Sequence, residues 1–185
     1  MDLNELASTR RSVRHYKNSG LSCDECRTKV EQILDFVRIN APSWKNSQTH
    51  RYYVALSAEK LSLVKAALSE RNQPKCENAI ALIVSAFEKD NAGFSDKDGV
   101  KVPDNELGNE WGAYDLGLSD SLLILKAREL GLDTLIMGLR DASALRDVLG
   151  IPQSQEVGAV ISVGIRDGAV AIPGHKELLD IAKFM

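Results

Sequence analysis

Residues 110–131, EWGAYDLGLSDSLLILKARELG, form the most informative stretch of the chain. As a helix they would be apolar around most of their circumference, and Gly131 provides a stop signal. A helix that is apolar all round has to be covered on several sides. The stretch also contains four small residues that would let another backbone approach closely: Gly112, Ala113, Gly117 and Ser121. We therefore expect a helix here that packs against more than one neighbour.

Hydrophobic periodicity and turn residues predict alternating helices and strands on both sides of this helix. Upstream, we expect helices at 2–9, from the Ser22 cap to Ala41 and at 58–70, and strands at 50–56 and 79–87. Downstream, we expect a strand at 133–138, a helix at 142–149, a strand at 157–165 and a partly amphipathic tail over 166–185. The polar residues 88–108 predict a long loop. The pattern is typical of one α/β domain, residues 1–185, with a layered sheet.

The composition is that of a globular domain with a single core. The 185 residues are 44% hydrophobic and 26% charged, and the formal net charge is −3. This charge gives no general attraction to nucleic acid or to an anionic membrane, and no apolar run is long enough to cross a bilayer. The first residues lack the features of a secretory signal, and three cysteines fit a reducing compartment. We expect a cytoplasmic protein.

Three arginines and a serine lie within five residues where the first helix is expected to end: Arg10, Arg11, Ser12 and Arg14. A guanidinium group presents a planar fork of donors that matches phosphate oxygens and planar carbonyl–nitrogen edges. Residues two apart in an extended segment point to the same side, so Arg10, Ser12 and Arg14 can share one face. The segment is a candidate anion site, and a solvated basic turn is the alternative.

A second candidate segment is 41–48, Ala-Pro-Ser-Trp-Lys-Asn-Ser-Gln. Pro42 opens a loop in which Ser43 and Asn46 offer neutral donors and acceptors at close range. Groups of this kind can recognise the polar edge of a planar ring. An ordinary connection between a helix and a strand is the alternative.

Together the two segments resemble the nitroreductase family. The similarity continues through Trp111–Asp115, Ala127–Leu132, Leu135–Gly138, Val160–Gly164 and a short basic tail, so that it covers almost the whole chain. The order and spacing of the motifs make the resemblance specific. It implies an α/β (α+β) nitroreductase-like fold, in which a central, mostly antiparallel sheet is flanked by helices and two chains form an intertwined homodimer.

The resemblance also implies bound FMN. Arg10 and Ser12 would hold its phosphate and ribityl chain, and Arg14 would face the pyrimidine side of the isoalloxazine ring. Arg11 belongs to the same motif, with a less defined role. The flavin would carry out the chemistry, so that no side chain is assigned as catalytic and Arg14 would tune the ring.

Two further groups of residues would complete the site if the resemblance holds. Pro42, Ser43 and Asn46 would reach the flavin that is bound mainly by the other subunit. Backbone N–H groups at Met137 and Gly138 would meet the O4/N5 edge of the ring.

The chain departs from the family pattern at three points. Gln48-Thr49-His50 stands where many relatives have Gln-Pro-Trp, and Met137-Gly138 stands where a glycine pair is common. The third point is the tail, where His175 and Lys176 stand at positions at which family members often place basic residues against the phosphate. Of these two, only Lys176 is a firm cation at neutral pH.

The function implied by the resemblance is hydride transfer from NAD(P)H through flavin N5 to a small acceptor such as a nitroaromatic or a quinone. Two alternatives stay open. One is a flavin store or sensor without turnover, and the other is a flavin-cleaving or dehalogenating relative on the same fold. Such relatives tend to carry active-site lids, for which residues 88–108 leave modest room. The sequence selects neither the acceptor nor NADH over NADPH.

Three other signals are interpreted as structural. Cys23 and Cys26 have the spacing of a redox or zinc motif, but zinc needs about four ligands and the sequence has no second pair. His15 is interpreted as a partly exposed loop residue. Asp115 and Asp120 are interpreted as helix surface or capping residues. We expect no metal site.

Overall fold

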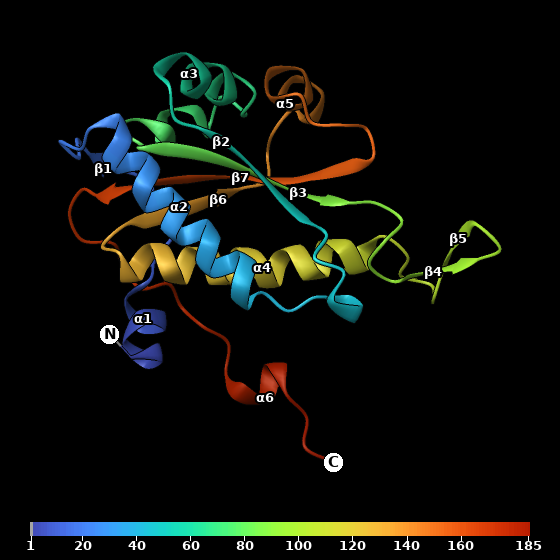
Figure 1. Cartoon of the computed structure of the whole chain (residues 1–185). Helices are drawn as coiled ribbons and strands as arrows, with labels where there is room; N and C mark the ends of the chain where they lie inside the picture. Colours follow the sequence, from blue (N-terminus) through green and yellow to red (C-terminus); the bar gives the residue numbers. More distant parts are fainter. Residues whose placement is uncertain (1) are drawn as a thin grey trace.

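The computed structural model describes residues 2–185, in which helices cover both faces of a central sheet (Figure 1). The named strands of the sheet pair antiparallel: β1 (Tyr16–Lys17), β2 (His50–Ala55), β3 (Ala81–Glu88), β6 (Asp133–Met137) and β7 (Gln155–Arg166). One face carries α3 (Ala58–Ala66) and α5 (Ala142–Leu149), and the other carries α2 (Cys23–Asn40) and α4 (Glu110–Glu129). β7 pairs with β1, β3 and β6. The predicted α/β fold with a mostly antiparallel sheet is confirmed.

The two faces of the sheet bury separate apolar clusters, because side chains alternate along each strand. Leu82 and Val84 of β3 belong to the cluster under α3 and α5, whereas Ala81 and Ile83 belong to the cluster under α2 and α4. All residues of β3 from 81 to 87 are buried. The apolar run in the sequence correctly predicted a strand covered on both faces.

Most predicted boundaries agree with the structure to within a few residues, and one helix is shorter than expected. The first helix is α1 (Leu3–Thr9). The helix expected at 58–70 ends at Ala66, because the residues after it pair with the segment before α5. Asp141 donates its N–H to the Ala67 carbonyl (2.7 Å), and Leu68 forms a bridge with Arg140.

The prediction of a loop over 88–108 is wrong for its central part. Residues 94–103 form a hairpin of β4 (Phe94–Lys97) and β5 (Val100–Pro103), which projects near the start of α4 (Figure 1). Asp98 and Gly99 form its turn with φ angles of 55° and 82°, the positive values that a type I′ turn requires. An Asp-Gly pair between short alternating segments is a hairpin signal, so the sequence contained this information.

The small residues of α4 differ in what they contact. Gly112 lies so close to the side chain of Phe87 in β3 that an added Cβ would come within 2.3 Å of its ring. The space beside Gly112 is therefore filled by a side chain of the same chain and not, as expected, by another backbone. Tyr114, Gly117 and Ser121 are exposed, and they leave one face of the helix uncovered within residues 2–185.

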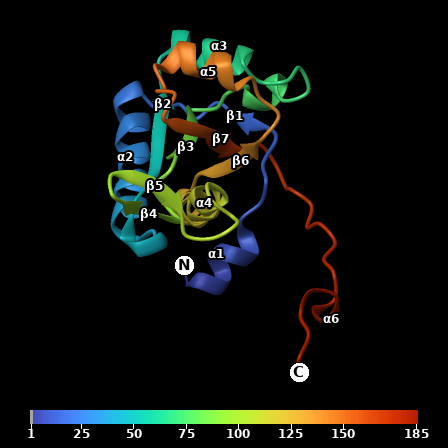
Figure 2. The ribbon, with the colours of Figure 1, turned by 90° about the vertical axis from the view of Figure 1, so that its right-hand side faces the viewer.

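The tail after β7 extends away from the body of the molecule (Figure 2). It contains one short helix, α6 (Leu178–Ile181). Its large apolar side chains are exposed: Ile172 by 71%, Leu178 by 60%, Leu179 by 75%, Ile181 by 71% and Phe184 by 77%. These side chains pack against no core within residues 2–185.

Candidate functional site

The arginine segment follows the end of α1 and lies at the surface. Asp2 caps the start of the helix, and Arg10 follows its last turn in an extended conformation. Val13 is buried and donates its N–H to the Thr134 carbonyl of β6 (2.9 Å). The short stretch between the helix and this anchor therefore holds Arg10, Arg11 and Ser12 at a fixed place on the sheet edge.

These residues line a hollow of about 590 Å³ between α1 and the tail. One wall consists of Ala7, Ser8, Arg10, Arg11, Ser12 and Arg14. The other wall consists of Val170, Ala171, Ile172, Pro173 and His175. The structure thus brings the predicted arginine segment and His175 together, although they are about 160 positions apart. Lys176 does not line this hollow.

The hollow carries positive charge that the chain itself does not neutralise. Among residues 2–185, neither Arg10, Arg11 nor Arg14 forms an ion pair with a carboxylate. Arg11 donates to the Arg10 carbonyl (2.6 Å) and Arg14 to the Ser12 carbonyl (3.2 Å). Several guanidinium donors therefore stay available for an anion, and a phosphate group fits their geometry.

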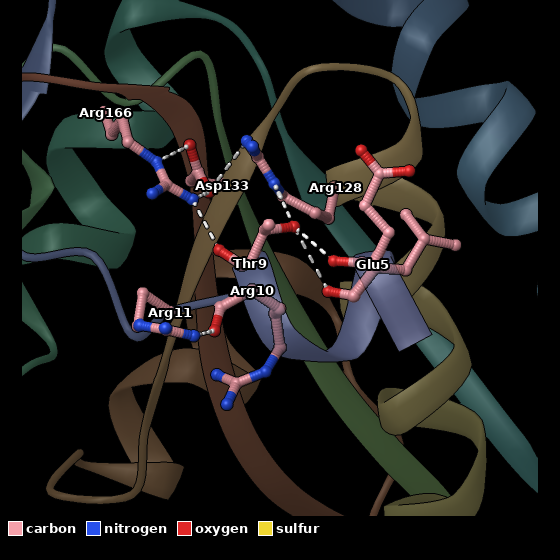
Figure 3. A network of polar contacts seen from close by, with 8 residues as sticks. Glu5, Thr9, Arg10, Arg11, Arg128, Asp133 and Arg166 are labelled. Carbon is pink, nitrogen blue, oxygen red and sulfur yellow. Dashed lines mark hydrogen bonds and ion pairs between the residues drawn. The ribbon is translucent and has the colours of Figure 1, made fainter. Parts of the chain in front are cut away.

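A buried acid lies directly behind the arginine segment (Figure 3). The side chain of Asp133 is 2% exposed and accepts hydrogen bonds from Arg166 at the end of β7, one of them at 2.8 Å. Arg128 of α4 approaches the same carboxylate at 3.5 Å. Both arginines also donate to Thr9, the last residue of α1. Sequence reasoning missed this network because its members are far apart along the chain.

The second predicted segment lies at the other end of α4. Its 3₁₀ turn, η1 (Trp44–Asn46), is held by the Trp44 N–H, which donates to the carboxylate of Asp115 (2.8 Å). Arg128, which contacts Thr9 just before the arginine segment, is 13 positions further along the helix than Asp115, or about 20 Å at 1.5 Å per residue. Within one chain, Pro42, Ser43 and Asn46 therefore lie far from the hollow.

The segment after Pro42 is strained and rich in unpaired polar atoms. Lys45, Asn46 and Gln48 have φ angles of 47°, 54° and 49°, which side chains other than glycine adopt rarely. Four buried side-chain atoms of residues 44–50 have no hydrogen-bond partner within residues 2–185: Trp44 Nε1, Ser47 Oγ, Thr49 Oγ1 and His50 Nδ1. Such features often cluster at functional surfaces.

Met137 and Gly138 occupy a third place, at the end of β6. The Met137 side chain is buried in the cluster under α3 and α5. Gly138 is exposed and lines a separate hollow of about 420 Å³, together with Leu139 and Arg140. The structure leaves the backbone of this turn accessible, and it does not join the turn to the hollow beside the arginines.

Comparisons with known proteins are consistent with this geometry. The profile of the Nitroreductase family matches residues 7–165. The chain belongs to the nitroreductase family. A comparison with curated protein sequences gave no match. Within residues 2–185, none of the helices is long and apolar enough to cross a membrane.

Solved structures of family members share the whole fold. A nitroreductase family protein from Clostridium difficile is 23% identical, with a TM-score of 0.76 and coverage of 100% of this chain and 98% of that chain. An FMN-dependent nitroreductase from the same organism is 22% identical, with a TM-score of 0.75 and 98% coverage of both chains. A candidate nitroreductase from Exiguobacterium sibiricum in complex with FMN is 22% identical, with a TM-score of 0.79 and coverage of 100% and 98%.

Two aspartates of α4 in this nitroreductase-family chain lie in a different environment from the one interpreted from the sequence. Asp115 and Asp120 were interpreted as helix surface or capping residues, but both are buried between α4 and neighbouring segments. Asp120 accepts hydrogen bonds from Tyr52 (3.0 Å) and Ser85 (2.9 Å) of the sheet. Burial raises the pKa of Asp120 to about 6, although these two hydrogen bonds oppose the shift.

We expect Asp120 to make stability depend on pH. Because its pKa rises from 3.8 to about 6 on folding, its stabilising contribution is present below pH 3.8 and is lost as the pH rises through about 6. The difference in unfolding free energy between wild type and Asp120→Asn should fall by about 2–3 kcal/mol from pH 4 to pH 7.5. Denaturant unfolding followed by circular dichroism measures it. A difference independent of pH would show that Asp120 titrates normally.

Proposed function

We propose that this protein is an FMN-dependent oxidoreductase that takes hydride from NADH or NADPH and passes it to a small acceptor such as a nitroaromatic or a quinone. The observation that supports this most directly is the hollow lined by Arg10, Arg11 and Arg14, whose charges no carboxylate of residues 2–185 neutralises. Membership of the nitroreductase family makes FMN the ligand to test first.

The residues around the hollow fit a flavin that ends in a phosphate. Arg10 and the Ser12 hydroxyl would hold the phosphate and ribityl chain, with Arg11 and His175 beside them. Arg14 would hold the pyrimidine side of the ring, where the reduced form carries negative charge. When bound, FMN supplies a ring that accepts hydride at N5 and returns it to the acceptor.

The remaining residues suggest that the working form is a homodimer. Pro42, Ser43 and Asn46 lie about 20 Å along α4 from the contact with the arginine segment, so a second chain would bring them to the flavin. The exposed apolar side chains of the tail also need a partner surface. Backbone N–H groups at Met137 and Gly138 would meet the ring edge, and Lys176 would contribute charge near the phosphate.

The test is the absorption spectrum of the purified protein, followed by release of the cofactor and an assay of NADH and NADPH oxidation. We expect denaturation to release FMN. We also expect NADH or NADPH to reduce the bound flavin and to support turnover with a quinone. Recovery of FAD, or no flavin binding after FMN is added, would contradict the cofactor. Tight FMN binding without oxidation of either nicotinamide would instead favour a flavin store or sensor.

Arg14 is expected to set the redox potential of the flavin. A cation beside N1 and the C2 carbonyl favours the anionic reduced ring, and we take the difference between redox states as about 1–2 kcal/mol. Arg14→Met should then lower the two-electron midpoint potential by roughly 20–45 mV. Spectrophotometric redox titration measures this shift. An unchanged potential with FMN still bound would show that Arg14 does not face the pyrimidine edge.

A further inference from the structure

Asp133 lies at a junction of four elements. It is the first residue of β6. Its carboxylate accepts a hydrogen bond from Arg166 at the end of β7 and forms an ion pair with Arg128 at the end of α4 (Figure 3). Arg166 then donates through Nη2 to the Thr9 carbonyl (3.0 Å), and Arg128 donates through Nε to the Thr9 hydroxyl (3.3 Å). One buried carboxylate thus orients two arginines, and both of them hold the last residue of α1.

The arginine segment is fixed at two points on consecutive residues of β6. Thr9 is tied to Asp133 through the two arginines, and Val13 is tied directly to Thr134 by its N–H (2.9 Å). A bridge between Ser12 and Thr134 reinforces the second point. The backbone is held on both sides, and the three residues between these points all line the hollow.

The opposite wall of the hollow begins from the same junction. Arg166 is the last residue of β7, and the next residue, Asp167, donates its N–H to the His15 carbonyl (3.0 Å). The tail then continues into the wall from Val170 to His175. The Asp133 carboxylate therefore connects the residues at which the two walls begin, Thr9 for one wall and Arg166 for the other.

We infer that Asp133 is a positioning residue that sets the spacing of the two walls and so determines how well the hollow binds the phosphate end of a flavin. It acts through Arg166 and Thr9 and does not itself contact the ligand. This inference rests on the proposed function, because it assumes that the anion in the hollow is the phosphate of FMN.

An argument from charge alone predicts the opposite change in FMN affinity. The direction of the change in Asp133→Asn therefore distinguishes the two explanations. Asp133 carries one negative charge, which offsets part of the positive charge of Arg166 and Arg128. If its charge were the only property that mattered, Asp133→Asn would raise the net positive charge near the phosphate by one unit and tighten FMN binding. If Asp133 acts by position, the same substitution weakens FMN binding.

The experiment compares FMN with riboflavin, which has the same ring but no phosphate. Dissociation constants are measured by flavin fluorescence for wild type, Asp133→Asn and Arg166→Lys. Lysine keeps the charge opposite Asp133 but lacks the planar fork that reaches both Asp133 and the Thr9 carbonyl. The control is Asp120→Asn, which removes another buried carboxylate that contacts neither α1 nor the tail.

We expect Asp133→Asn to raise the dissociation constant for FMN about tenfold and to change that for riboflavin by less than about twofold. Arg166→Lys should show the same selective loss to a smaller degree, and it decides the question if Asp133→Asn fails to fold. Asp120→Asn should change neither constant.

Equal weakening of FMN and riboflavin would mean a general structural role and would overturn the inference, as would unchanged or tighter FMN binding. If wild type binds FMN but the variants keep its preference over riboflavin, only this inference fails. If wild type binds neither flavin, the proposed function fails with it.

Discussion

Replacing Arg10 with methionine is expected to weaken FMN binding by roughly ten- to hundredfold. The reason is that Arg10 lines the hollow without a carboxylate partner in residues 2–185, so its charge is available to the phosphate. A charge-assisted hydrogen bond contributes about 1.5–3 kcal/mol, which corresponds to a change of this size. The midpoint potential should stay the same, because the phosphate does not change charge during turnover. Titration of the apoprotein with FMN measures the effect.

The matched control is Arg27→Met, which removes an exposed arginine of α2 that lies away from the hollow. It should leave FMN affinity unchanged. If Arg10→Met binds FMN as tightly as this control, the phosphate does not lie beside Arg10. A shift in potential for Arg10→Met similar to that expected for Arg14→Met would instead place the flavin ring at Arg10.

Deleting residues 169–185 is expected to impair both FMN binding and self-association. The deletion removes one wall of the hollow while it keeps Arg166 and its contacts with Asp133. It also removes six large apolar side chains that are exposed in the single chain, Met185 among them. Because burial of one such side chain contributes about 1.5–3 kcal/mol, dimer affinity should fall more than about hundredfold and FMN affinity more than about tenfold. Sedimentation velocity over a range of concentrations and flavin titration measure the two effects.

A second variant separates the two roles of the tail. Leu178→Ser combined with Leu179→Ser removes apolar side chains from α6 but leaves the wall from Val170 to His175 intact. We expect this variant to dimerise more weakly while each dimer still binds FMN. A truncated chain that remains dimeric and retains FMN would show that the tail contributes to neither.

The fold could be predicted from the sequence wherever local periodicity determines the structure. The apolar run of β3 and the capping box of Ser22 and Glu25 identify a buried strand and a helix start without tertiary information. The burial of Asp120 was also predictable in principle, because it follows Leu116 by four positions and precedes Leu123 by three on one face of α4, whereas Asp115 lies at the border of that face. Their charge suggested a surface position, but desolvation is partly offset here by hydrogen bonds from the sheet and from the Trp44 backbone.

The candidate site was predictable only in part. The clustering of Arg10, Ser12 and Arg14 is local, and an extended segment is enough to place them together. The network behind them is not local, because Thr9 and Arg166 are 157 positions apart and no spacing rule connects them. Tertiary structure is also needed to see that residues 42–46 lie at the opposite end of α4.

The position of β7 in the sheet has a consequence for how the chain folds during synthesis. β7 pairs with β1, β3 and β6, so it joins strands that cannot otherwise complete the sheet. β3 ends at Glu88 and β7 begins at Gln155, a separation of about 70 residues. At about 5–20 residues per second, the ribosome needs on the order of 4–15 s to make that stretch. During this time one edge of the apolar strand β3 stays unpaired, so the nascent chain exposes a segment that is prone to non-native strand pairing.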